Sequence, residues 1–233
     1  MLYKICHALS FVGVALYIVL LAPKYSFKRI RSLIHIALTY GTAYLSMMFL
    51  FYLVTGYSGG QNIVRIFIFV PPIAVFYGKV LNMQTDKILD FYAPAPCIVL
   101  GIAKFGCAFA DCCRSWLKVD WGIYDSLVNE KLFPVQIFEA ITGLVIAAIV
   151  WSMARKKDYD AHGRTMAWAL FLFGITRFGW EFLRDNDKLF LGLSEFALWA
   201  IITALVGMVW LVWTADIEEE TSEQTKEEIV EQT

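Results

Sequence analysis

The chain has 233 residues, of which 59% are hydrophobic and 16% aromatic, and its mean hydropathy is +0.59. Soluble domains are about 45–50% apolar even when glycine is counted, so the composition excludes an ordinary soluble domain and predicts a membrane protein. The formal net charge is only −1, and no basic patch stands clear of the loops, which argues against a nucleic-acid partner.

Apolar runs of roughly 17–25 residues predict an all-α membrane protein with seven transmembrane helices. The first run follows Lys4 and precedes a basic cluster, and it lacks a small-residue cleavage motif. We therefore expect a retained helix and not a cleaved signal peptide. The predicted helices are His7–Ala22, Ser32–Thr55, Ile63–Gly78, Ala93–Ala110, Pro134–Ala154, Thr165–Phe182 and Ser194–Thr214.

The distribution of basic residues predicts the orientation of these helices. The loops after the first, third and fifth helices hold ten lysines and arginines, against seven on the other side. Cytoplasmic loops carry the excess of these residues, so we expect the N-terminus and the polar loop 111–133 outside and the C-terminus in the cytoplasm. The predicted organisation is a transmembrane domain over residues 1–215 and an acidic, disordered cytoplasmic tail over residues 216–233.

Four ionisable residues fall inside predicted helices and away from their cytoplasmic ends: Lys104, Glu139, Arg177 and Glu181. At 1.5 Å of rise per residue, Lys104, Glu139 and Arg177 lie at one level, roughly 8–9 Å below the outer ends of three helices. A charge within hydrocarbon costs roughly 2.5–3.5 kcal/mol even on lenient insertion scales. The pattern is consistent either with an interhelical ion-pair network that only fixes packing or with a polar cavity, open to the outer leaflet, that suits an anionic headgroup.

Cys107, Cys112 and Cys113 are spaced C-x4-C-C. On a continuous helix the second and third point about 140° and 240° away from the first, so they converge on a metal only if the helix breaks. Structural zinc sites usually show paired cysteine or cysteine–histidine spacing. We therefore expect no metal, with a disulfide or small packing residues as the alternatives.

Four blocks resemble, in order and spacing, the conserved blocks of the prolipoprotein diacylglyceryl transferase family. The first is Ala103–Cys113, AKFGCAFADCC, and the second is the pair Trp121-Gly122. The third is Phe133–Glu139, FPVQIFE, and the fourth is Gly174–Arg184, GITRFGWEFLR. The resemblance covers roughly Asp90–Leu198.

The resemblance implies an enzyme of the bacterial cytoplasmic (inner) membrane. The family moves a diacylglyceryl group from phosphatidylglycerol to the thiol of a lipobox cysteine in an exported preprolipoprotein, so an anionic phospholipid and that protein are the implied partners, with no cofactor. Lys104 and Arg177 stand at the family's two essential arginines. By position in these blocks, Glu139 and Glu181 are predicted to be catalytic, and the predicted substrate-binding residues are Lys104, Arg177, Cys107, Asp111 and Gln136.

The sequence also departs from the family pattern. The link Lys79–Tyr92 lacks the histidine of the family's His-Gly-Gly loop. Lys104 replaces an arginine and so loses the bidentate fork of a guanidinium, and Asp111 replaces a glycine. A non-catalytic paralogue that binds lipid or a partner membrane protein is therefore an alternative, and a thiol-redox membrane protein is a further one.

Overall fold

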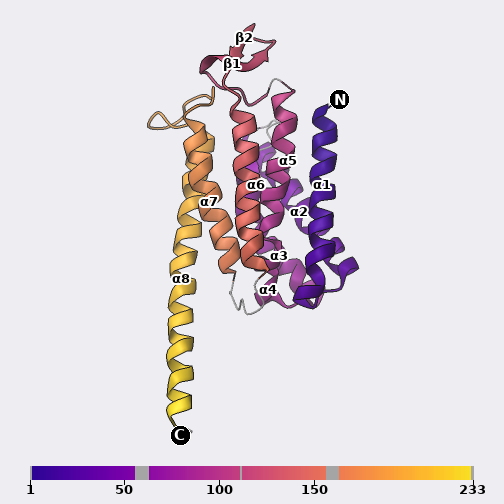
Figure 1. Cartoon of the computed structure of the whole chain (residues 1–233), viewed down its shortest axis with the longest axis vertical. Coiled ribbons are helices and arrows are strands. Elements are labelled where there is room, and N and C mark those ends of the chain that lie inside the picture. Colours follow the sequence, from indigo (N-terminus) through magenta and orange to yellow (C-terminus); the bar gives the residue numbers. More distant parts are fainter. Residues whose placement is uncertain (1, 56–62, 111, 156–162, 232–233) are drawn as a thin grey trace.

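The computed structural model describes residues 2–55, 63–110, 112–155 and 163–231. Figure 1 shows its helices side by side in a bundle, with a small hairpin at one end. The helices are α1 (Leu2–Leu21), α2 (Arg29–Thr55), α3 (Ile63–Val80), α4 (Thr85–Tyr92), α5 (Pro94–Ala108), α6 (Val135–Ala154), α7 (Arg164–Glu181) and α8 (Glu195–Glu231). A 3₁₀ turn, η1 (Ala22–Tyr25), follows α1, and the hairpin consists of β1 (Lys118–Asp125) and β2 (Glu130–Leu132).

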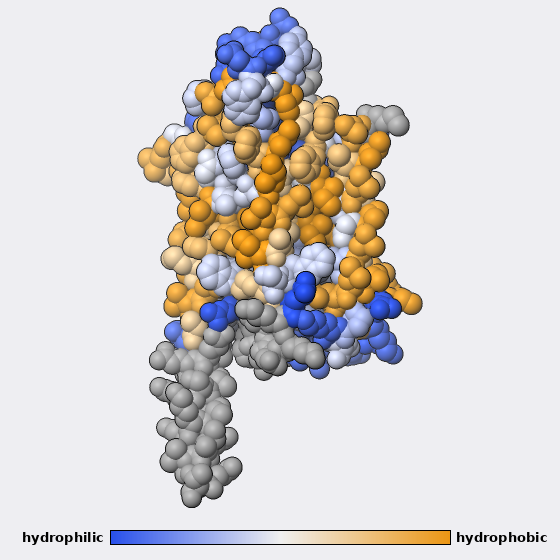
Figure 2. All heavy atoms as spheres, viewed as in Figure 1, coloured by the Kyte–Doolittle hydropathy of each residue, from blue (hydrophilic) through white to orange (hydrophobic). Residues whose placement is uncertain are grey.

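The surface has the distribution expected of a membrane protein. Figure 2 shows a broad hydrophobic band across the visible face of the bundle, with hydrophilic side chains gathered on the hairpin at one end and at the opposite end of the bundle. By length and composition, four helical segments of the described chain could cross a membrane: Leu2–Tyr25, Lys87–Ala108, Val135–Ala154 and Glu195–Asp216. The chain is thus a mostly helical membrane protein, and the prediction of seven spans remains a prediction.

Close contacts between small residues hold the central helices together. A Cβ atom on Gly143 of α6 would lie 3.1 Å from Cα of Gly101 in α5, so the two helix backbones meet at these glycines. The same occurs between α7 and α8, where a Cβ on Gly174 would lie 2.7 Å from Cα of Ala204. Small residues at helix crossings are typical of membrane bundles, because they let the backbones approach.

A buried carboxylate fixes the start of α7. Asp90 of α4 accepts hydrogen bonds from the backbone nitrogens of Gly163, at 2.9 Å, and Thr165, at 2.7 Å. These nitrogens belong to the orphan donors at a helix N-terminus, and a negative charge there is also favourable to the helix dipole. The short helix α4, which the apolar pattern did not predict, thereby sets the axial position of α7.

Three other features differ from the sequence prediction. The helix expected to reach Ala110 ends at Ala108, where α5 stops. The polar loop contains the antiparallel β1–β2 hairpin, in which the Asp125 side chain accepts hydrogen bonds from the backbone nitrogens of Leu127 and Val128 and so shapes the turn. Helix α8 is helical to Glu231, through the segment for which the composition predicts disorder. The predicted division into a transmembrane domain over residues 1–215 and a separate tail over residues 216–233 remains a prediction.

Figure 1 also shows how the ends of the chain lie. The beginning of α1 and the hairpin are at the same end of the bundle, and the far end of α8 is at the other. The segments around the end of α5, the start of α6 and the end of α7 therefore meet below the hairpin. These are the segments that carry the predicted site residues.

Candidate functional site

The close crossing of α5 and α6 positions the first two charged side chains. Lys104 follows Gly101 by three residues on α5, and Glu139 precedes Gly143 by four residues on α6, so each lies about one turn from the glycine contact. The amine Nζ of Lys104 lies 2.5 Å from Oε2 of Glu139. The sequence analysis places Lys104 and Glu139 at one level of the membrane, and the glycine contact brings their two helices close enough for a direct ion pair.

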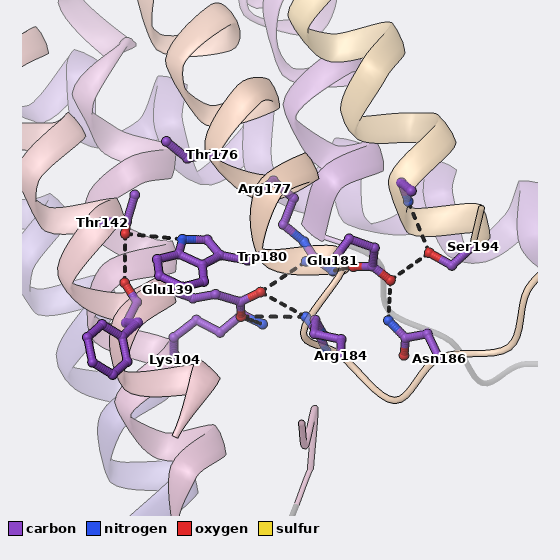
Figure 3. A network of polar contacts seen from close by, with 12 residues as sticks. Lys104, Glu139, Thr142, Thr176, Arg177, Trp180, Glu181, Arg184, Asn186 and Ser194 are labelled. Carbon is purple, nitrogen blue, oxygen red and sulfur yellow. Dashed lines mark hydrogen bonds and ion pairs between the residues drawn. The ribbon is translucent and has the colours of Figure 1, made fainter. Parts of the chain in front are cut away.

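Glu139 is the centre of a larger cluster, shown in Figure 3. Its Oε1 accepts hydrogen bonds from Nη1 of Arg177, at 3.0 Å, and from Nη1 of Arg184, at 3.1 Å. Together with Lys104, three cations thus contact one carboxylate. A carboxylate that is paired in this way is strongly stabilised in its ionised form.

Glu181 forms the second half of the cluster. Arg177 bridges the two carboxylates, since its Nη2 lies 2.7 Å from Oε2 of Glu181, one helical turn away on α7. The other oxygen of Glu181 accepts hydrogen bonds from Ser194, at 2.6 Å, and from the amide of Asn186. The Ser194 hydroxyl also accepts from the backbone nitrogen of Ala197, at 3.1 Å, and so caps the start of α8. The site is therefore tied to four helices.

Arg184 belongs to this cluster although its role was not predicted. It follows the end of α7, in a segment that the sequence analysis treated as a loop outside the membrane. Burial opposes its charge, but Glu139, Cys113 and Glu181 together outweigh that effect and raise its pKa. The guanidinium groups of Arg177 and Arg184 both lie near the ring of Phe196, at 5.8 and 6.0 Å from its centroid. The sequence did contain one signal for a role of Arg184, because the fourth block ends at this residue.

All five charged side chains are buried. Their exposed fractions are 7% for Lys104, 3% for Glu139, 4% for Arg177, 2% for Glu181 and 5% for Arg184. A hollow beside the cluster has a volume of about 10 Å³, roughly the room that one water molecule needs. Of the four predicted charges only Glu139 and Arg177 line it, together with Thr142 and Trp180. The cavity expected to be shared by all four charged residues remains a prediction.

The remaining predicted residues lie in the segment that follows α5. The amide of Gln136 donates a hydrogen bond to the backbone oxygen of Cys112, at 2.9 Å, and so fastens this segment to α6. Cys107 is buried in the last turn of α5. Asp111 lies outside the described residues. All five cysteines of the chain are free thiols in the structure.

The structure meets the condition that the sequence analysis sets for convergence of the three cysteines, a break in the helix. Since α5 ends at Ala108, and Cys113 adopts a left-handed conformation with φ of 58°, the chain turns back on itself. The sulfur atoms of Cys107, Cys112 and Cys113 consequently all lie within 4.8 Å of one another. The described segment therefore brings three thiols together beside the ion cluster.

The fold and the site together define the class of this protein. It is a mostly helical membrane protein with a buried cluster of cations and carboxylates at one end of its bundle. A sequence model of the family described as prolipoprotein diacylglyceryl transferase matches residues 2–213, so the chain belongs to that family. The match spans all four blocks and nearly the whole helical bundle.

Curated relatives carry the same family name. A Clostridium perfringens protein named phosphatidylglycerol–prolipoprotein diacylglyceryl transferase 2 is 28% identical over 132 residues, which cover 54% of this chain and 50% of that one. A Streptococcus uberis protein named phosphatidylglycerol–prolipoprotein diacylglyceryl transferase is 24% identical over 143 residues, covering 58% and 54%. A Pseudomonas entomophila protein of that name is 28% identical over 180 residues, covering 72% and 66%. The chain spans about half the length of the first two.

Proposed function

We propose that this protein transfers a diacylglyceryl group from phosphatidylglycerol to the lipobox cysteine thiol of an exported preprolipoprotein. Family membership and the names of the relatives support this reaction class. The observation that carries the proposal for this chain is the convergence of Lys104, Arg177 and Arg184 on one buried carboxylate. Two of these cations occupy positions of the family's essential arginines.

The charge of the cluster favours an anionic substrate. Three buried cations are paired with only two buried carboxylates, so one positive charge is in excess within the cluster. Nε of Arg184 is buried and has no hydrogen-bond partner among the described residues. An unsatisfied buried donor is costly, and a phosphate oxygen would satisfy it. Because the neighbouring hollow holds about one water, the headgroup enters only when some of these ion pairs separate.

The reaction requires a nucleophilic thiolate and a stabilised leaving group. The acceptor sulfur forms a bond to the glyceryl carbon while the bond from that carbon to the phosphate oxygen breaks. Negative charge then develops on the departing glycerol phosphate, and preorganised cations stabilise it. Lys104, Arg177 and Arg184 are the groups that we assign to this role.

The two carboxylates have different surroundings, and we assign them different roles. Three cations contact Glu139, and we assign it the role of positioning these cations. Glu181 contacts one cation, Arg177, and accepts from the neutral groups of Ser194 and Asn186. Because fewer cations contact Glu181 than Glu139, we assign to Glu181 the role of accepting the thiol proton.

The finer membrane arrangement is part of the same proposal. Seven spans with the N-terminus outside and the C-terminus in the cytoplasm would place the hairpin end, and with it the ion cluster, towards the outer leaflet of a bacterial inner membrane. An exported protein presents its lipobox on that side. The start of α1 and the hairpin lie at the same end of the bundle, which is consistent with this arrangement.

A non-catalytic lipid-binding paralogue is the second candidate function. The absence of a histidine in the link between α3 and α5 and the lysine at position 104 favour it. Both candidate functions require the same phosphate-binding cations. They differ only in whether transfer of the diacylglyceryl group to the thiol follows lipid binding.

The test measures phosphatidylglycerol binding to purified variants beside transfer to a lipobox peptide. Arg177→Ala should weaken lipid binding about 10- to 100-fold, since a hydrogen bond to a charged group contributes roughly 1.5–3 kcal/mol. Arg177→Lys should also weaken it, because it loses the fork that bridges two groups, whereas Lys104→Arg should retain binding. Lys118→Ala, which removes an exposed ion pair in the hairpin, is the matched control.

The possible outcomes separate the two candidates. If Arg177→Ala and Lys104→Ala both bind the lipid as the wild type does, the proposal is wrong and the charges form only a packing network. If binding falls in these variants but the wild type never transfers the diacylglyceryl group, the chain is the non-catalytic paralogue.

A further inference from the structure

The three clustered thiols have no role in the function proposed above. Cys107, in the last turn of α5, and Cys112 and Cys113, in the segment that follows, have sulfur atoms that all lie within 4.8 Å of one another. Thiols packed only as small residues do not need to face one another. Mutual proximity of three soft donor atoms is the arrangement that a thiophilic cation requires.

We propose that Cys107, Cys112 and Cys113 bind one thiophilic divalent cation such as Zn²⁺. With a zinc–sulfur bond of about 2.3 Å and tetrahedral angles, ligand sulfurs lie about 3.8 Å apart. Because the sulfur atoms all lie within 4.8 Å of one another, they have to move together by at most about 1 Å. Rotation of cysteine side chains accomplishes this without movement of a helix.

The segment that carries two of the ligands is already anchored. Gln136 holds the backbone oxygen of Cys112 from α6. On the other side, the hydroxyl of Ser115 donates to the backbone oxygen of Leu183, at 2.5 Å, and Arg114 pairs with Asp185, at 3.3 Å. Anchors on both sides keep the chain in the conformation that brings the thiols together, so little ordering is needed when the ion binds.

The surrounding charge favours the thiolate form that a metal ligand needs. Two cations of the charged cluster, Lys104 and Arg184, lie near the Cys113 thiol. Each thiol that becomes a ligand loses its proton to solvent, and the resulting negative charge then lies beside these two cations. The ion cluster thus stabilises the metal site electrostatically.

Three protein ligands leave one position of a tetrahedral ion open, and this position suits the acceptor thiol. A thiol that coordinates such an ion is deprotonated outright, so the ion would generate the nucleophilic thiolate in a chain that lacks the family's histidine. The lipobox thiol passes its proton to Glu181, the sulfur forms the bond to the glyceryl carbon as the bond from that carbon to the phosphate oxygen breaks, and glycerol phosphate departs. This part of the inference depends on the proposed function, whereas the ion site itself does not.

The first experiment measures the ion alone. The full-length protein is purified in detergent under reducing conditions, incubated with Zn²⁺, freed of unbound metal, and analysed for zinc. We expect one zinc per chain in the wild type and in Cys6→Ser, a half-buried thiol outside the cluster. Cys112→Ser and the double variant Cys112→Ser, Cys113→Ser should lose the bound zinc, and a thermal unfolding curve without added metal checks that each variant folds.

Two results would overturn the ion site: a reduced wild type that retains no zinc, or a folded double variant that retains as much zinc as the wild type. The second experiment replaces zinc with Co²⁺, whose visible absorption reports its ligands, and adds a lipobox peptide that contains either cysteine or serine. Only the cysteine peptide should change the spectrum. If neither does, the open position does not take the acceptor thiol. Phosphatidylglycerol binding is measured separately, so failure of the proposed function is distinguishable from failure of the ion site.

Discussion

Glu139 is the residue on which the charged cluster depends. It contacts Lys104, Arg177 and Arg184, and its exposed fraction is 3%. Without its charge, three buried cations would have only Glu181 for compensation. Removal of one partner from a buried ion pair is much more damaging than loss of a surface pair, because the remaining charge is left desolvated.

Glu139→Gln should therefore lower the free energy of unfolding by about 3–5 kcal/mol. The control is Glu130→Gln, which makes the same chemical change in the exposed Lys118–Glu130 pair of the hairpin, where such pairs contribute about 0–1 kcal/mol. Unfolding of both variants in the same detergent, followed by circular dichroism, measures the difference. Equal midpoints for the two variants would contradict the central position of Glu139.

At the scale of the elements, the crossing of α7 and α8 controls the geometry of the site. Helix α7 carries Arg177 and Glu181, and α8 begins beside Ser194, which contacts Glu181. The two helices meet at Gly174, where a Cβ would lie 2.7 Å from Cα of Ala204. Real Cβ atoms do not come so close to a backbone atom, so the helices would have to separate.

Gly174→Ala should consequently destabilise the protein by about 1–3 kcal/mol, the usual range for overpacking, despite the roughly 1 kcal/mol by which alanine is the better helix former. Gly179→Ala, on the same helix, meets nothing within 4 Å and should be neutral or slightly stabilising. Melting temperatures of the two variants in one detergent test this contrast. The reverse order would show that the α7–α8 contact is not tight.

For the whole molecule, the arrangement of the two ends predicts accessibility. The hairpin lies at the opposite end of the bundle from the end of α8, and the loop charges predict that the hairpin end is outside. In a variant without native cysteines, Ser126→Cys should react with a membrane-impermeant thiol reagent in intact cells, and Asp216→Cys only after lysis. Reaction of Asp216→Cys but not Ser126→Cys in intact cells would reverse the orientation.

The sequence by itself determined the class of the protein and the level of its charged residues. Hydropathy indicates membrane helices because the thickness of the bilayer sets the length of their apolar runs. The constant rise per residue of a helix then places Lys104, Glu139 and Arg177 at similar depth. The cost of burying each charge then predicts a common cluster, and the structure brings the three together with Glu181.

Only the tertiary structure decided which groups touch. Depth along a helix says nothing about the distance between helices, and the glycine contacts at Gly101 and Gly143 set that distance. Arg184 enters the cluster from the turn that follows α7, beyond the end of the predicted helix. The cysteines converge because α5 ends at Ala108. The bond from Gln136 to the backbone of Cys112 fastens the segment that follows, and it forms only when segments far apart in the sequence meet.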